Sequence, residues 1–148
     1  MWGAFAAHGA GFIRRVEGRL EQLQMQDIIN DSLLPSCDML FGGPSHCIVQ
    51  QDNDPKHTAR SVQNLMNELG MVQLDWPAQS PDLNPIENLW SIFDYQLKTR
   101  KVNTADELYE LLESHWKDLD PRLLDKLVCS MPDRIEACIA AKGKHTKY

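Results

Sequence analysis

The 148-residue sequence lacks several features that would mark it as a membrane, secreted or repeat protein. No apolar run approaches the roughly 18 residues of a membrane-spanning helix, so we expect no membrane partner. The first residues, "MWGAFAAHGAGFIRR", have no basic start before their apolar stretch, which argues against a signal peptide. No internal repeat is present, and this length predicts a single domain over residues 1–148.

Closely spaced cysteine pairs are also missing. The four cysteines are far apart in the chain and form no C-x-x-C motif: Cys37, Cys47, Cys129 and Cys138. This spacing favours an intracellular protein with reduced thiols over a disulfide framework.

Positive charge is scarce, since the formal net charge is −6 at pH 7. A self-sufficient DNA-binding module is normally basic, so this charge argues against one. An acidic domain can still hold cations and leave nucleic-acid affinity to another segment. Only the tail "KGKHTKY" (142–148) is locally basic, and we interpret it as a solvated, poorly ordered terminus.

The sequence does contain an alternation of short strands and helices. We expect two strands joined by a turn at residues 8–11, because glycine there permits positive φ. A helix is expected over residues 19–34, ending before Pro35, and then a loop over 39–45. The apolar centre at 47–49 predicts a strand that ends at Asp52.

Helix-start signals recur in the remainder of the chain. Asp54 followed by Pro55 predicts a helix that Gly70 ends, and a short strand follows in "MVQLDW". Four further helices are expected, and their starts read "NPIE", "TADE", "DPRLL" and "MPDRI". This order predicts an α/β fold with a helical C-terminal layer.

The helix that starts at "NPIE" has a clear apolar stripe. We expect the stripe to be buried against the sheet, with Glu87 accessible at the helix start. Its residues are Ile86, Leu89, Trp90, Phe93 and Leu97.

Two carboxylates occupy positions where ligands of α/β proteins usually bind. Asp52 ends a predicted strand, and Glu87 lies in the first turn of a helix, with 34 residues between them. The path between them is helix, strand and helix start, so both carboxylates could reach one edge of the sheet and share Mg²⁺, which prefers hard oxygen ligands. Two such ions could activate a water or hydroxyl group and stabilise the leaving oxygen of a phosphodiester.

Structural roles remain open for each of these polar residues. Glu87 is the third residue after Asn84, so helix capping explains it without catalysis. Asp52 could simply end its strand, and Asn53 could orient Asp52 or contact a phosphate. We interpret Asp54 as a helix cap and His57 as a locally hydrogen-bonded residue of the first turn, with a direct metal role for His57 as the alternative.

Two longer motifs point to a family. "QQDNDPKHTA" and "WPAQSPDLNPIENLW", together with the closing "AKGKHTKY", resemble the catalytic-domain signature of Tc/mariner superfamily transposases. The segments "WGAF" and "GFIRRVEG" resemble the early strands of that domain, so the resemblance covers essentially the whole chain. A Glu 34 residues past Asp52 resembles the Asp-Asp-Glu (DDE), Tc-like branch rather than the mariner branch, whose third acid is Asp.

The resemblance implies a ribonuclease-H-like fold, in which helices flank a mixed five-stranded sheet. It also implies magnesium-dependent cleavage at transposon ends and attack of the freed 3′-hydroxyl on target DNA. Asp52 corresponds to the second catalytic acid and Glu87 to the third, both as metal ligands, with Mn²⁺ as a substitute for Mg²⁺. The expected partner is DNA, the expected location is the nucleus, and the full-length family protein is expected to form a homodimer.

The sequence also departs from the family. The family's first catalytic Asp and its strand lie upstream of "WGAF", and the basic helix-turn-helix region lies upstream as well. We therefore expect a partial domain, lacking the first strand and carrying extra C-terminal helices, that is inactive by itself. The alternative function is that of a non-catalytic transposase remnant or interaction module.

Overall fold

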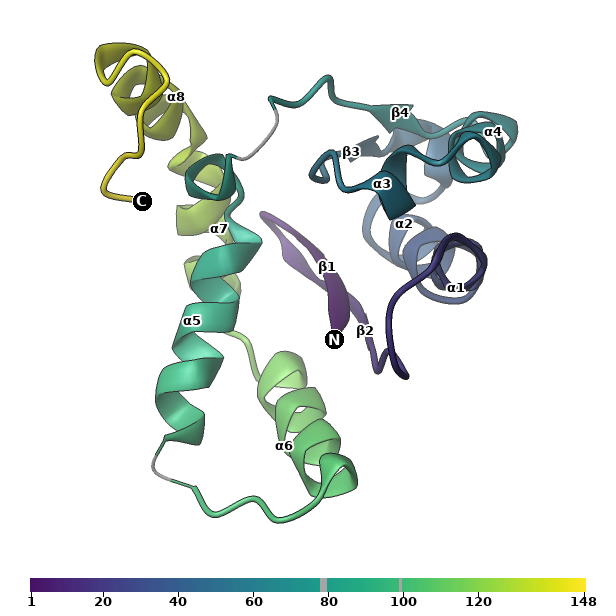
Figure 1. Cartoon of the computed structure of the whole chain (residues 1–148), viewed down its shortest axis with the longest axis vertical. Helices are drawn as coiled ribbons and strands as arrows, with labels where there is room; N and C mark the ends of the chain where they lie inside the picture. Colours follow the sequence, from purple (N-terminus) through teal and green to yellow (C-terminus); the bar gives the residue numbers. More distant parts are fainter. Residues whose placement is uncertain (78–79, 99) are drawn as a thin grey trace. The chain divides into compact units, whose positions relative to one another are not determined.

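The computed structural model describes residues 1–77, 80–98 and 100–148 (Figure 1). The chain divides into two compact units, which are described separately below. The first unit comprises Met1–Ala4 and Gly11–Ser80, and the second comprises Phe5–Ala10 and Pro81–Tyr148. That residues 1–148 form one domain stays a prediction.

The chain begins with strands β1 (Trp2–Ala6) and β2 (Gly9–Arg14), which form a two-stranded sheet. The turn between them lies at residues 7–8, so the predicted turn at 8–11 was wrong. Gly11 is needed inside β2 for close packing: a Cβ atom there would lie 2.6 Å from Ser36 Oγ. The same hydroxyl accepts a hydrogen bond from the backbone N–H of Phe12 at 2.9 Å. Gly11, one of the glycines from which the turn was predicted, is therefore a strand residue at which a helix approaches the backbone closely.

One helical run, rather than the predicted helix over 19–34, follows the hairpin. It consists of α1 (Gln22–Ile28), a π-helical turn η1 (Ile29–Leu33) and α2 (Leu34–Phe41). Proline has no N–H, and its ring clashes with the carbonyl four residues earlier. The wider π turn precedes Pro35, which lies in the first turn of α2, so the helical run continues through the proline.

The expected loop over 39–45 is shorter than predicted, because α2 includes its first residues. The helix ends at Gly42, whose φ of 73° is left-handed. A short 3₁₀ helix, η2 (Pro44–His46), then leads to the next strand.

A parallel strand pair carries the Asp52 segment. β3 (Ile48–Val49) pairs with β4 (Val72–Gln73) in parallel, through α3 (Pro55–Thr58) and α4 (Arg60–Glu68). The expected single helix from Pro55 to Gly70 is therefore two helices, separated at Ala59, where ψ is 135°. Gly70 ends α4 as predicted, with a φ of 70°.

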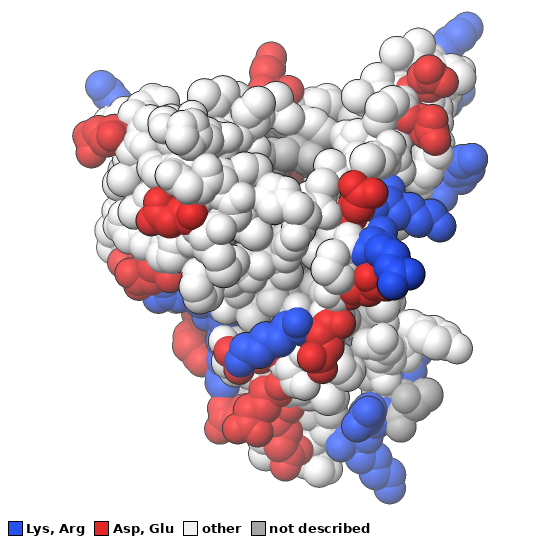
Figure 2. All heavy atoms as spheres, turned by 180° about the vertical axis from the view of Figure 1, so that it is seen from behind, with Lys and Arg blue, Asp and Glu red and all other residues white. Residues whose placement is uncertain are grey.

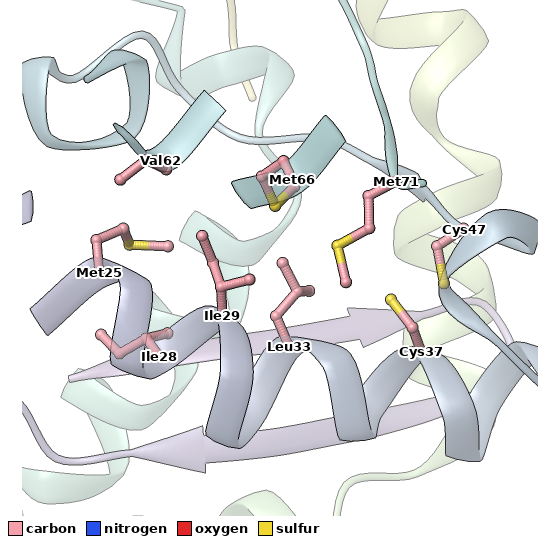
Figure 3. Packing of buried hydrophobic residues seen from close by; sticks show 9 residues of the cluster. All are labelled: Met25, Ile28, Ile29, Leu33, Cys37, Cys47, Val62, Met66 and Met71. Carbon is pink, nitrogen blue, oxygen red and sulfur yellow. The ribbon is translucent and has the colours of Figure 1, made fainter. Parts of the chain in front are cut away.

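The core of the first unit lies between the α1–α2 run and α4 (Figure 3). In Figure 3, side chains along the helical run face those of α4. The buried side chains are aliphatic or contain sulfur: Met25, Ile28, Ile29, Leu33, Cys37, Cys47, Val62, Met66 and Met71. Burial raises the pKa of the Cys37 thiol to about 12, and a hydrogen bond with Cys47 contributes. All four cysteines are free.

The second unit is built mainly of helices that follow a 3₁₀ turn, η3 (Pro81–Leu83). All four predicted C-terminal helices are present: α5 (Ile86–Leu97), α6 (Ala105–Lys117), α7 (Pro121–Cys129) and α8 (Met131–Ala140). The strand and helix order predicted from the sequence is thus confirmed, and the fold is mixed α/β.

Aromatic side chains form the centre of the second unit. The Trp90 and Trp116 rings stack with their centroids 5.6 Å apart, and Phe93 lies 6.0 Å from Trp90 and 6.2 Å from Trp116. Along α5, Leu89 and Phe93 are buried, whereas Glu87 is exposed. The other stripe residues are partly buried, so the predicted helical periodicity is confirmed. Packing of the stripe against a sheet stays a prediction.

The described strands form two separate two-stranded sheets. Among the described residues, no helix combines the length and apolar character needed to cross a membrane.

Candidate functional site

Asp52 lies in the short segment between β3 and α3, and the side chain is 58% exposed. Its Oδ1 atom accepts two hydrogen bonds, from Nδ1 of His57 at 2.7 Å and from the backbone N–H of Asp54 at 3.2 Å. Both donors are close in sequence, because α3 begins directly after Asp52. The carboxylate is therefore oriented by its own segment and remains open to solvent.

His57 holds Asp52 from a largely buried position, with only 12% of its side chain exposed. A carboxylate can only accept at this contact, so Nδ1 of His57 is the donor. Nε2 is buried and has no hydrogen-bond partner among the described residues. The predicted local hydrogen bonding of His57 is confirmed, and its partner is the candidate ligand itself.

Asp54 is the helix cap that the sequence predicted. Its carboxylate accepts a hydrogen bond from the backbone N–H of Lys56 at 3.1 Å and forms an ion pair with Nζ of Lys56 at 2.5 Å. These contacts with Lys56 lower the pKa of the Asp54 carboxyl below its usual value. Asp54 is thus a structural residue that begins α3.

Amide side chains anchor the segment on either side of Asp52. Asn53 donates from Nδ2 to the backbone carbonyl of Trp76. The side-chain oxygen Oε1 of Gln73 accepts from Nε2 of Gln51 at 3.0 Å and from Nε2 of Gln63 at 3.1 Å. Nε2 of Gln63 also donates to the backbone carbonyl of His57 at 2.8 Å. This glutamine network was not predicted from the sequence, although Gln73 lies in β4 and Gln51 two residues after β3.

Glu87 lies in the first turn of α5 with its side chain exposed. Its backbone N–H donates to the carbonyl of Asn84 at 3.1 Å, which closes the first turn. The helix starts one residue later than predicted, because Pro85 precedes it as the cap position. The predicted cap at Asn84 was therefore wrong, because the cap position is Pro85. An acidic side chain in this turn is still favourable with the helix dipole, so a structural role stays open alongside metal binding.

Asp52 belongs to the first unit and Glu87 to the second. That their carboxylates meet at one edge of a sheet stays a prediction. Within residues 1–77, 80–98 and 100–148, no group of three or more His, Cys, Asp or Glu side chains is placed to hold a metal ion.

Charged side chains of both signs are mixed on the face that Figure 2 shows. Acidic side chains are spread over this face, and Lys or Arg side chains lie beside several of them. This distribution agrees with the net charge of −6.

Comparison with known proteins decides the family. The model of the DDE superfamily endonuclease domain matches residues 1–109. The chain belongs to the DDE superfamily of endonucleases. The residues matched include both candidate acids, and the resemblance to Tc/mariner transposases is confirmed.

Relatives and solved structures agree with this family. The chain is 37% identical over 148 residues to the Tc1 transposase of Caenorhabditis elegans, covering 100% of this chain and 54% of that protein. It therefore spans about half the length of this curated relative. The structure of the Mos1 transposase catalytic domain with Raltegravir and Mg matches with a TM-score of 0.87 and 21% identity, covering 97% of this chain and 74% of that one.

A second structure, the mariner Mos1 paired-end complex with Mg, has a TM-score of 0.85 and 22% identity, covering 95% of this chain and 42% of that one. At these identities the structural matches establish the fold. The predicted ribonuclease-H-like fold is confirmed.

Proposed function

We propose that this domain belongs to a DNA transposase that cleaves and joins DNA with a divalent cation, Mg²⁺ or its substitute Mn²⁺. Asp52 and Glu87 are the proposed ligands. The observation that carries the proposal is that a chain of the DDE endonuclease family has one exposed acid between β3 and α3 and another in the first turn of α5. The Mos1 structures that contain Mg support a divalent cation in this fold.

The donors present fit such an ion. Carboxylate oxygens are the hard ligands that Mg²⁺ prefers, and an exposed carboxylate leaves room for the waters that Mg²⁺ retains. Asp52 meets both requirements, since its side chain is 58% exposed while Oδ1 is fixed by His57. When bound, the ion would activate a water or hydroxyl group and stabilise the leaving oxygen of a phosphodiester.

The surrounding residues of the first unit have supporting roles in this proposal. The His57 hydrogen bond selects one orientation of the Asp52 carboxylate, as outer-shell partners of metal ligands commonly do. Asn53 and the glutamine network fix the backbone that carries Asp52 to β4 and α4. Asp52 is therefore held in place before any ion binds.

The proposed partner is DNA, both transposon ends and target, and the proposed location is the nucleus. Support comes from a similar structure, the Mos1 transposase paired-end complex with left transposon end. A homodimer of the full-length protein is part of the same proposal. With a net charge of −6, residues 1–148 should bind DNA weakly and with strong salt dependence.

A chimera tests the proposed function directly. Residues 1–148 would replace the matching segment of the C. elegans Tc1 transposase, and Mg²⁺-dependent cleavage at a transposon end would be measured. We expect cleavage, and we expect its loss in both Asp52→Ala and Glu87→Ala. Cleavage that survives either substitution would contradict the ligand assignment.

Residues 1–148 alone should not nick DNA above background with Mg²⁺ or Mn²⁺. They carry two of the three acids that the family resemblance implies, and a two-metal site without a shared ligand positions the reacting oxygens poorly. Robust nicking that both alanine substitutions abolish would contradict this expectation. An inactive chimera that is folded would instead favour the alternative, a non-catalytic remnant or interaction module.

A further inference from the structure

Arg134 of α8 is a buried cation, with only 2% of the residue exposed. A buried charge is costly unless its donors are paired. Three of its nitrogens donate hydrogen bonds: Nε to Ser130 Oγ at 2.8 Å, Nη1 to the Asp82 carbonyl at 2.8 Å and Nη2 to Asn88 Oδ1 at 2.7 Å. The planar guanidinium therefore joins α8 to two places 46 and 52 residues earlier in the chain.

The two distant contacts lie on either side of Glu87. Asp82 belongs to η3, which precedes α5, and Asn88 is the residue directly after Glu87. One rigid side chain thus holds both the approach to the helix and its first turn. Glu87 itself is exposed, so the clamp fixes its backbone and leaves its carboxylate accessible.

The C-terminal residues complete this arrangement. Asp82 is buried, at 7% exposed, and its Oδ2 accepts a hydrogen bond from the backbone N–H of Thr146 at 3.3 Å. The Arg134 guanidinium carbon lies 4.8 Å from the centre of the Tyr148 ring, within cation–π range. The predicted solvated and poorly ordered tail was therefore wrong for Thr146 and Tyr148, which pack against the clamp.

We propose that Arg134 is a positioning residue for Glu87: its guanidinium holds Asp82 and Asn88 so that the Glu87 carboxylate is presented in one fixed place to a divalent cation. This inference rests on the proposed function. Residues that orient a metal ligand contribute strongly to affinity, because a mobile ligand must be ordered when the ion binds. Arginine suits the role because its fork of donors reaches two acceptors at once.

The test uses the whole chain, labelled with ¹⁵N and titrated with MnCl₂. Bound Mn²⁺ broadens nearby amide signals, so the Mn²⁺ concentration that halves the signals of residues 86–89 reports binding at Glu87. We expect Arg134→Lys, which keeps the charge but loses the fork, to raise this concentration about tenfold. Arg122→Lys is the matched control, because the Arg122 side chain is 95% exposed.

Two further measurements separate positioning from a general loss of structure. Signals around Asp106, an exposed acid in the first turn of α6, should broaden at the same Mn²⁺ concentration in all variants. Asn88→Ala removes one acceptor and leaves Arg134 bound to Asp82 and Ser130, so it should give a smaller rise of about threefold. It also provides a readout if Arg134→Lys does not fold.

Glu87→Gln distinguishes failure of this inference from failure of the proposed function. If Glu87→Gln raises the Mn²⁺ concentration needed at residues 86–89 while Arg134→Lys and Asn88→Ala leave it unchanged, the positioning role is wrong and Glu87 is still a ligand. If Glu87→Gln itself has no effect, Glu87 is not a ligand, and the proposed function and this inference both fail. A rise in all three variants, with Arg122→Lys unchanged, supports the positioning role.

Discussion

The two candidate ligands are held in different ways. In the first unit, Asp52 is oriented by donors two and five residues further along, from Asp54 and His57. In the second unit, the segment that carries Glu87 is fixed by Arg134, which lies 46 residues after Asn88. A short motif can therefore supply both a ligand and its support at Asp52, whereas the support of Glu87 requires a distant helix.

The cores of the two units differ in a similar way. Aliphatic and sulfur-containing side chains fill the first unit, and methionine adapts its shape to irregular space (Figure 3). In the second unit, Trp90, Phe93 and Trp116 meet with defined ring geometry. Removal of one side chain should thus be tolerated better in the first unit than in the second.

The largest expected loss of stability comes from removing one buried side chain from each core, which tests the difference between them. Trp116→Ala should lower the free energy of unfolding by about 3–5 kcal/mol, because it empties the centre of the aromatic cluster. Met66→Ala should cost about 2–4 kcal/mol, since flexible neighbours can partly fill the space. Urea unfolding measures both values, and Tyr95→Ala, at a residue 74% exposed, is the control. A larger loss for Met66→Ala would reverse the comparison.

An intermediate effect is expected where the first unit depends on a contact between distant residues. Gly11→Ala should cost about 1–3 kcal/mol, because the new Cβ would lie 2.6 Å from Ser36 Oγ and 2.9 Å from the Ala4 carbonyl oxygen.

The control for Gly11→Ala is the same change made in a Ser36→Gly background, where the clash with the serine is absent. There the additional cost should be clearly smaller, and the difference between the two values measures the coupling. Equal costs in both backgrounds would show that the serine is not the obstacle.

The smallest effect compares one helix cap in each unit. Asp54 accepts from the Lys56 N–H at the start of α3, and Thr104 accepts from the Glu107 N–H at the start of α6. Replacing either by Ala should lower the free energy of unfolding by about 0.5–1 kcal/mol at pH 7. Thermal unfolding of the two variants beside the parent chain measures the change.

The pH dependence should distinguish these two caps. The contact with Lys56 lowers the pKa of Asp54 in the folded chain, so its contribution is present above the unfolded pKa and is lost as the pH falls below about 4. The threonine hydroxyl does not titrate, so Thr104→Ala should lower the free energy of unfolding by the same amount at pH 7 and at pH 2. An Asp54→Ala effect that persists at pH 2 would show that the charge is not involved.

Much of the candidate site could be predicted from short patterns in the sequence. The Asp54 cap and the place of Glu87 in a first helical turn follow from residue types and spacing. The strand before Asp52 ends at Val49, so the prediction that it ends at Asp52 was wrong. The stripe of α5 also follows, because a period of 3.6 residues places Leu89 and Phe93 on one face. Local hydrogen bonding of His57 was predicted, although its partner Asp52 was not. The amide network did not follow, because its side chains come from different elements.

The sequence alone determined the order of strands and helices, the helix starts and the family to which the chain belongs. These features depend on interactions within a few residues, such as caps and apolar periodicity, which a linear pattern records. Tertiary structure decided that Gly11 lies within a strand and that Arg134 clamps the Glu87 segment. Both depend on atoms brought together from distant parts of the chain, where packing outweighs the local preference of glycine or arginine.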